Sequence, residues 1–200
     1  MTFLFDNGHG IDTKGKRSPD GRLLEYQYAR RVVTEIVNRL RAAGHDARAI
    51  VPEDADISLT ERARRVNAIC DSVGKNSVLL VSVHCNAAGS GADWMNARGW
   101  EAWTSPGQTR GDLLADALYD AAQKHLPAGT PIRTDLSDGD RDKEACFTIL
   151  TRTRCAACLT ENLFQANRAD VDFLLSPAGF EAIVALHLEG VLAFARNHPL

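Results

Sequence analysis

The fold class is decided by one short run near the middle of the chain, Val78-Leu79-Leu80-Val81-Ser82-Val83. The run has the length of one strand, and it lacks the apolar–polar alternation of a strand with one wet face. A nearly continuous apolar strand is typical of a parallel sheet that helices cover on both faces. The run therefore predicts a central parallel strand, with His84 directly after it.

Short apolar runs and helical stripes alternate on both sides of this strand. Further strands are predicted at residues 3–5, 47–51, 99–104, 147–150 and 155–160. The spacing i, i+3, i+4, i+7 predicts helices within residues 29–40, 59–73, 113–121 and 180–195. Residues 128–146 are rich in Gly, Asp, Arg and Thr and predict a long mobile loop. The alternation predicts an α/β fold: a single domain over residues 1–200 with a mostly parallel twisted sheet and helices on both faces.

Composition narrows the class of protein. A chain of 200 residues with 44% apolar side chains can bury a full core without disulfide or metal cross-links. The formal charge of −3 comes from 23 basic and 26 acidic side chains that are interspersed, so neither nucleic acid nor an anionic membrane surface is an expected partner. The apolar runs fall short of the roughly 20 residues of a membrane span, so no membrane insertion is expected. The sequence does not predict an oligomeric state.

Five cysteines are an odd number, and free thiols are the simplest interpretation. Cys155 and Cys158 have the spacing of a redox or zinc motif. A structural zinc would need a second such pair, which the sequence lacks. Both lie in an apolar segment, so core packing is the expected role.

Four residues suited to metal or proton chemistry are predicted at one edge of the sheet. His9, His84 and Glu161 each follow a predicted strand, and Glu25 lies where the first crossover enters its helix. Ligand sites in open α/β sheets form at the carboxyl ends of the strands. Two histidines and one carboxylate make the His₂Glu set of a catalytic zinc site.

The two glutamates are expected to differ in role. Glu25 lies in a polar stretch at a helix start, which favours a ligand role. Glu161 leaves a buried strand, where desolvation raises the pKa of a carboxyl group and suits it to acid–base catalysis. Asp6 is expected either to orient a ligand histidine or to cap the turn, rather than to bind the metal itself.

Several motifs resemble the zinc-dependent N-acetylmuramoyl-L-alanine amidases of the Amidase_3 type. They are Asp6-Asn7-Gly8-His9-Gly10, Glu25, Ser82-Val83-His84-Cys85-Asn86 and Glu161-Asn162 with Phe164 and Asn167. The resemblance runs in order over nearly the whole chain. It departs at Cys85, where the family more often has Ala, and at a longer polar loop over residues 15–21.

The resemblance implies one Zn²⁺ per chain, held by His9, Glu25 and His84, with Glu161 as the catalytic glutamate. It implies hydrolysis of the amide between the lactyl group of N-acetylmuramic acid and L-alanine. Peptidoglycan is thus the expected substrate and the expected binding partner. Asn86 and Asn162 either fix loops or contact this substrate, and Trp94 is a candidate for stacking on a sugar. The Arg and Asp residues within residues 133–141 form either a solvated loop, which is the simplest interpretation, or a wall of the groove that grips the stem peptide.

Other functions compete with this interpretation. They are a zinc carboxypeptidase-like peptidase, a catalytically silent peptidoglycan-binding module, and a thiol enzyme built on Cys85. The target lies outside the membrane, yet the sequence shows neither a signal peptide nor a wall-binding domain. A phage-type endolysin, made in the cytosol and released through a pore, fits both observations. An exported enzyme whose leader has been removed fits them too.

Overall fold

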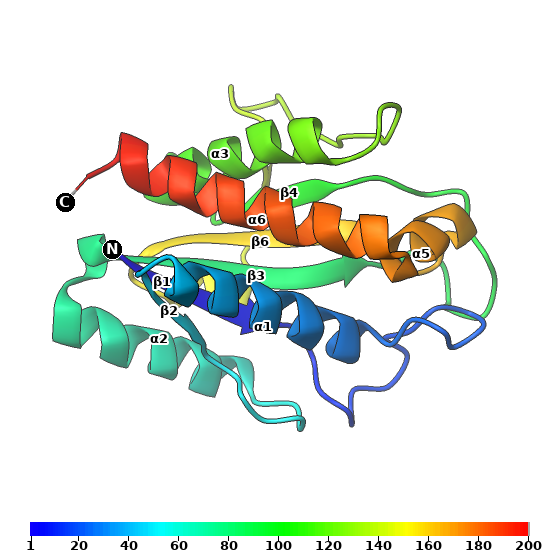
Figure 1. The fold of residues 1–200 in the computed structure, drawn as a ribbon, viewed down its shortest axis with the longest axis horizontal. Coiled ribbons are helices and arrows are strands. Elements are labelled where there is room, and N and C mark those ends of the chain that lie inside the picture. The colour runs from blue at the N-terminus through cyan, green and yellow to red at the C-terminus, as the bar shows by residue number, and fades with distance from the viewer. Residues whose placement is uncertain (200) are drawn as a thin grey trace.

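The computed structural model describes residues 1–199, and within them it contains one six-stranded sheet of order β2-β1-β3-β6-β4-β5 (Figure 1). The strands are β1 (Thr2–Asn7), β2 (Asp46–Ala49), β3 (Val78–Asn86), β4 (Glu101–Thr104), β5 (Lys143–Glu144) and β6 (Ala156–Phe164). Neighbouring strands are parallel except β4 and β6, which are antiparallel. The predicted α/β fold with a mostly parallel sheet is confirmed.

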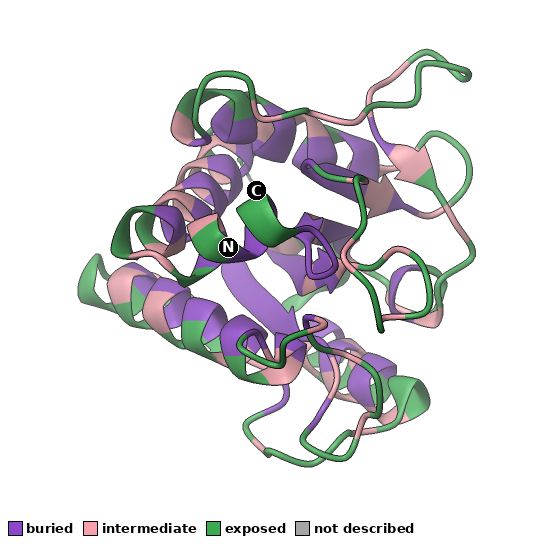
Figure 2. Cartoon of the chain, turned by 90° about the vertical axis from the view of Figure 1, so that its right-hand side faces the viewer, coloured by how far each residue is buried: buried purple, intermediate pink, exposed green. Residues whose placement is uncertain are grey.

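Helices cover both faces of this sheet. They are α1 (Glu25–Ala42), α2 (Leu59–Val73), α3 (Arg110–His125), α4 (Thr148–Thr151), α5 (Arg168–Leu175) and α6 (Pro177–Asn197), with a 3₁₀ turn η1 (Lys75–Ser77). Successive side chains of β3 point to opposite faces. Leu79 and Val81 pack in the core formed with α1, α3 and α6, whereas Leu80 packs with α2 and α4. Figure 2 shows the buried strands between the helices.

Helix α6 has the length and apolar composition of a membrane span, with a mean hydropathy of 1.5 over its most apolar window. Half of that window is buried inside the molecule, against α3 and α1. The contact with α3 is close at Gly190, where a Cβ would lie 2.7 Å from Leu118 Cδ2. Burial in the core therefore accounts for the apolar composition of α6.

Two predicted segments differ from the structure. Residues 147–150, predicted as a strand, form the short helix α4, in which the N–H groups of Leu150 and Thr151 donate to the Phe147 carbonyl. A short apolar run does not distinguish a strand from a buried helix, and Ile149 and Leu150 satisfy the core in helical form. The sequence also gave no expectation of α5, which begins at a cap where Asn167 Oδ1 accepts from the Asp170 N–H.

The segment predicted as a mobile loop, residues 128–146, is held to the domain. It contains β5, and Ile132 forms a bridge to Trp100. Arg141 donates to Asp116 of α3 and lies over the Tyr119 ring. The segment is mostly loop, as predicted, and it is anchored on α3 and β4; its mobility stays a prediction.

Both central strands also run further than predicted. β3 continues to residue 86 and β6 to residue 164, so His84 and Glu161 lie within strands rather than after them. The reason is pairing, since β4 forms a ladder with β6 at the level of Glu161. These paired extensions fix His84 and Glu161 on the rigid part of the sheet.

Candidate metal centre

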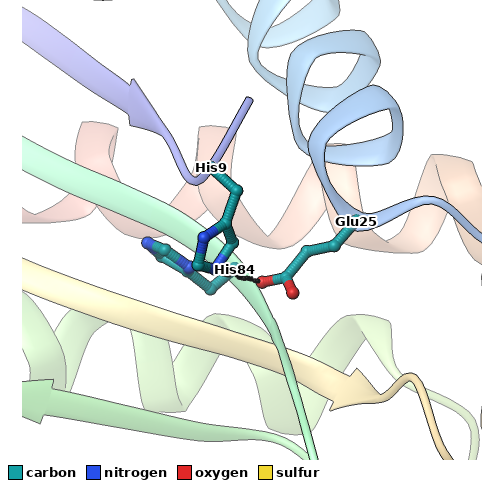
Figure 3. A group of neighbouring side chains, drawn as sticks. All are labelled: His9, Glu25 and His84. Carbon is teal, nitrogen blue, oxygen red and sulfur yellow. Dashed lines mark hydrogen bonds and ion pairs between the residues drawn. The ribbon is translucent and has the colours of Figure 1, made fainter. Parts of the chain in front are cut away.

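Three predicted ligands from distant parts of the chain meet at the carboxyl edge of the sheet (Figure 3). His9 follows β1, Glu25 is the first residue of α1, and His84 lies in β3. Glu25 Oε1 lies 3.4 Å from His9 Nε2 and 3.3 Å from His84 Nδ1. All three ligand atoms lie within 4.8 Å of one another.

The turn after β1 is shaped for this meeting. His9 has a φ of 61°, a left-handed conformation that costs a residue with a side chain some strain. A Cβ on Gly8 would lie 2.2 Å from His84 Cε1, so only glycine lets the turn approach the imidazole. The Gly8 N–H donates to the Val83 carbonyl at 3.1 Å and holds the turn against β3.

The charge state of Glu25 suits a ligand. Its side chain is 1% exposed, and burial alone would raise the pKa of the carboxyl group. Hydrogen bonds from His84 and His9 outweigh burial and hold the pKa of Glu25 well below its usual value. Burial also tends to lower the pKa of His84, but the neighbouring carboxylates of Glu25 and Glu161 raise it.

The three side chains fit a divalent cation. The second oxygen of Glu25, Oε2, is buried and has no hydrogen-bond partner in the described part of the chain. A buried carboxylate oxygen without a partner is costly, and a cation between this group and two imidazole nitrogens would compensate it. Two nitrogens and one oxygen are the donor set of catalytic zinc sites.

A buried network orients His84 from behind. Its Nε2 lies 3.1 Å from Ser82 Oγ, and the Ser82 hydroxyl donates to Asp6 Oδ2 at 2.5 Å. The Ser82 hydroxyl donates its proton to Asp6, so it accepts from Nε2–H of His84, and Nδ1, which faces Glu25, is the nitrogen that would bind a cation on losing its own proton. Arg62 Nη1 holds the other oxygen of Asp6 at 2.5 Å. Asp6 therefore acts on His84 through Ser82, as a positioning residue.

Glu161 lies beside His84 because the two residues are in register on β6 and β3. It is half-buried, and its Oε2 has no hydrogen-bond partner within residues 1–199. Burial raises the pKa of Glu161 to about 8, with smaller effects in the same direction from Glu25 and Glu101, while His84 opposes the shift. A carboxyl group with a pKa near neutrality is suited to taking up and releasing a proton.

A cavity of about 720 Å³ opens beside these groups. His9, His84 and Glu161 line one side of it, and apolar side chains including Leu59, Phe147 and Leu159 line another. Such a mixed wall suits a ligand with both polar and apolar parts.

The three residues predicted to contact substrate occupy different settings. Asn162 is fully buried, accepts from Trp100 Nε1 at 2.9 Å and donates to the His84 carbonyl at 2.9 Å, which favours positioning over substrate contact. Asn86 is half-buried and donates to Glu101 Oε1. Trp94 packs partly against the core, and the Arg168 guanidinium lies 4.5 Å from its ring.

The side chains of Cys85 and Cys158 lie in the apolar core rather than in the cavity. Cys85 is 3% exposed with its side chain in the core, and burial raises the pKa of its thiol well above the usual value, which is unfavourable for a nucleophile. Its backbone N–H donates to Glu25 Oε1. Cys158 is buried within β6, which confirms core packing there, and Cys155 packs against the same apolar cluster as Cys70.

Sequence reasoning missed Ser82 and Glu101. A strand places residues two apart on one face, so Ser82 could have been found from its spacing to His84. Glu101 could not, because its pairing with Glu161 depends on the antiparallel entry of β4.

The α/β fold, with its ligand cluster at the carboxyl edge of the sheet, is typical of a metal-dependent hydrolase domain. The sequence matches the family described as N-acetylmuramoyl-L-alanine amidase (Amidase_3) over residues 4–193. The chain therefore belongs to this family.

Individual relatives agree with this assignment. The chain is 28% identical over 193 residues to an endolysin of Bacillus phage SPP1, a match that covers 93% of this chain and 63% of the endolysin. The chain thus spans less than two thirds of the length of this relative.

Solved structures share the fold. The catalytic domain of CwlV, an N-acetylmuramoyl-L-alanine amidase from Bacillus (Paenibacillus) polymyxa var. colistinus, superposes with a TM-score of 0.80 at 16% identity, covering 98% of this chain and 99% of that one. An N-acetylmuramoyl-L-alanine amidase from Clostridium difficile 630 gives 0.79 at 23% identity, covering 98% and 96%.

Proposed function

We propose that this chain is a zinc-dependent amide hydrolase that cleaves the bond between the lactyl group of N-acetylmuramic acid and L-alanine in peptidoglycan. One observation carries the proposal. Glu161 is a half-buried carboxyl group in register with His84 of the His9–Glu25–His84 cluster, and its Oε2 has no hydrogen-bond partner among residues 1–199. Membership of the amidase family supports the choice of bond.

The residues of the chain have distinct roles in this reaction. His9, Glu25 and His84 would hold one Zn²⁺, which supplies a Lewis acid that polarises the carbonyl and lowers the pKa of water. Glu161 accepts a proton from the attacking water and later donates it to the departing nitrogen of L-alanine. The raised pKa of Glu161 fits both halves of this cycle. Ser82 holds the His84 ring in place throughout.

The chain is proposed to act as a single catalytic domain, residues 1–200, on the bacterial cell wall. Its relatedness to a phage endolysin favours a lytic role. Either release through a pore after cytosolic synthesis or export with a removed leader would bring it to this substrate.

The alternatives make different demands on the structure. A thiol enzyme needs an ionisable cysteine in the cavity, and Cys85 is buried with its pKa raised. A silent binding module would not need a buried carboxyl group beside the ligand cluster, such as Glu161, whose Oε2 has no hydrogen-bond partner among residues 1–199. A carboxypeptidase-like peptidase needs a cationic side chain that binds the terminal carboxylate of its substrate. Such an enzyme would cut a peptide bond of the stem rather than the bond between the lactyl group and L-alanine.

Mass spectrometry of digested peptidoglycan tests the proposal. New L-alanine amino termini on intact glycan strands are the expected products. Activity should disappear with a chelator, return with Zn²⁺, and persist in iodoacetamide. Cleavage elsewhere in the stem peptide would favour the peptidase, and binding without any cleavage would favour the silent module.

A further inference from the structure

A second polar cluster lies next to Glu161, outside the cavity and the metal centre. Its centre is Glu101, the first residue of β4, which is in register with Glu161 of β6. Glu101 is 2% exposed, so its charge needs close partners. Arg133 Nε donates to Glu101 Oε2 at 2.6 Å, and Lys143 Nζ lies 3.3 Å from the same oxygen.

The other oxygen of Glu101 is also fixed. Its Oε1 accepts from Asn86 Nδ2 at 2.7 Å and from Trp103 Nε1 at 3.1 Å. The carboxylate is therefore held by donors on both oxygens and serves as an anchor for two cations. One anion and two cations leave the cluster with a net charge of +1.

The two cations keep unused donors that face solvent. Arg133 is 39% exposed and Lys143 is 21% exposed. Among residues 1–199, neither Nη1 nor Nη2 of Arg133 has a hydrogen-bond partner, while its Cζ lies 5.2 Å from the centre of the Phe164 ring. A guanidinium that is fixed through Nε and a ring face presents its two Nη groups in a set direction, which suits a carboxylate.

We propose that Arg133 and Lys143 form a subsite for the free α-carboxylate of the second residue of the stem peptide. The inference rests on the proposed function. In the stem peptide, that residue is a glutamate joined onward through its γ-carboxyl group. Its α-carboxylate is free in some cell walls and converted to a carboxamide in others, so the subsite would select between the two forms.

The spacing of the sheet supports this placement. His84, Glu161 and Glu101 lie side by side on three neighbouring strands, and strands are about 4.8 Å apart, so Glu101 lies about 10 Å along the row from His84. Consecutive Cα atoms of a peptide are about 3.8 Å apart. With the scissile carbonyl at the metal centre, the second residue therefore reaches roughly 7 Å along this row, and the long Arg133 side chain can cover the rest.

The charge balance explains the selectivity. Glu101 alone would repel a substrate carboxylate, and its two cations reverse the sign of the local charge. A carboxamide lacks the charge that Arg133 and Lys143 would bind. Loss of a hydrogen bond to a charged group typically lowers binding by about tenfold or more.

Two matched substrates test the subsite. They are N-acetylmuramoyl tripeptides that carry either the free α-carboxylate or the α-carboxamide on the second residue. The zinc-loaded wild-type protein should cleave the acid with a kcat/KM at least about tenfold above that of the amide. In Arg133→Met and Lys143→Met this ratio should fall toward one, mostly through KM, and Arg133→Lys should retain part of it.

Arg48→Met is the matched control, since Arg48 pairs with Asp46 on β2 at the opposite edge of the sheet. Its acid-to-amide ratio should equal that of the wild type, and circular dichroism should show each variant folded. Equal cleavage of both substrates by the wild type, or an unchanged ratio in both Met variants, would overturn the subsite and leave the proposed function standing. Failure to cleave either substrate would overturn both.

Discussion

The two faces of the sheet are built for different tasks. On the face covered by α1, α3 and α6, the strands present mostly apolar side chains to the core, such as Phe3 and Cys158, and Thr160 of β6 is hydrogen-bonded to His187 of α6. On the other face, Leu80 and Leu159 begin an apolar core under α2 and α4, but toward the carboxyl ends the same strands present Ser82 and His84. Because α4 is four residues long, this end of the face stays open as a cavity.

The contrast teaches how one strand can serve both stability and chemistry. In β3, every second residue packs into the thick apolar layer, which fixes the strand in place. The residues between them, such as Ser82 and His84, point to the open face, and the fixed backbone limits their movement. Changes on the open face should therefore act on rate and metal binding, and on stability where they leave a buried charge unpaired, whereas changes on the covered face should act on stability alone.

The largest effect should come from the proton-transfer group on the open face. Glu161→Gln keeps the shape of the side chain but removes its proton chemistry, so kcat should fall by about 10³- to 10⁴-fold, or roughly 4 to 5 kcal/mol. Zinc content measured by elemental analysis should stay near one per chain.

The matched control is Glu35→Gln, at a partly exposed carboxylate on α1, which should keep full turnover in the same peptidoglycan assay. Near-wild-type turnover of Glu161→Gln would show that another group carries the proton.

The next effect concerns the buried network behind His84. Arg62 is 1% exposed and donates to Asp6 and to the backbone carbonyls of Asn7 and Ile57. Arg62→Met leaves Asp6 as an uncompensated buried charge, so the free energy of unfolding of the metal-free protein should fall by about 3 to 5 kcal/mol in urea titrations.

The same change should weaken zinc binding about 10- to 100-fold in a chelator competition, since Ser82 loses the fixed acceptor that orients it toward His84. Arg64→Met, on the exposed side of α2 and paired with Glu61, should change neither quantity by much. Stability that drops while zinc affinity stays unchanged would show that Asp6 does not act on His84.

The sequence predicted the covered face better than the open one, for a physical reason. Periodicity reports burial, so the stripe on residues 29–40 and the run at 78–83 located their elements correctly. His9, Glu25 and His84 were found because the carboxyl ends of parallel strands meet at one edge of the sheet, where ligand sites form. Glu101 was not found, because its position depends on the antiparallel pairing of β4 with β6. The helix at Thr148–Thr151 was predicted as a strand, because a short apolar run does not distinguish a strand from a buried helix.

A third effect should appear on the covered face as the pH falls. His187 of α6 is fully buried, and burial lowers its pKa to about 4, so the folded protein keeps this imidazole neutral. The unfolded chain takes up a proton near pH 6.5 and the folded chain does not, so stability is complete above pH 6.5 and falls as the pH drops toward 4. The loss should approach about 3 kcal/mol.

Urea titrations between pH 7.5 and 4.5 measure this loss. In His187→Gln the decline should be shallower than in the wild type, whereas His45→Gln, at a partly exposed position, should follow the wild-type curve. Parallel curves for the wild type and His187→Gln would show that His187 takes up a proton without unfolding.

The smallest effect should come from an ion pair on the outside of the covered face. Arg39 of α1 binds Glu181 of α6 through both guanidinium nitrogens at 2.6 and 2.7 Å, yet both side chains are more than a third exposed. Water solvates such charges in the unfolded chain almost as well, so Arg39→Met should lower the free energy of unfolding by about 1 kcal/mol or less, and 0.5 M salt should reduce the difference further. Arg39 and Arg62 both make short contacts with carboxylates, but Arg62 is buried and also donates to backbone carbonyls. A loss for Arg39→Met as large as that for Arg62→Met would mean that contact geometry, rather than burial, sets the strength of these pairs.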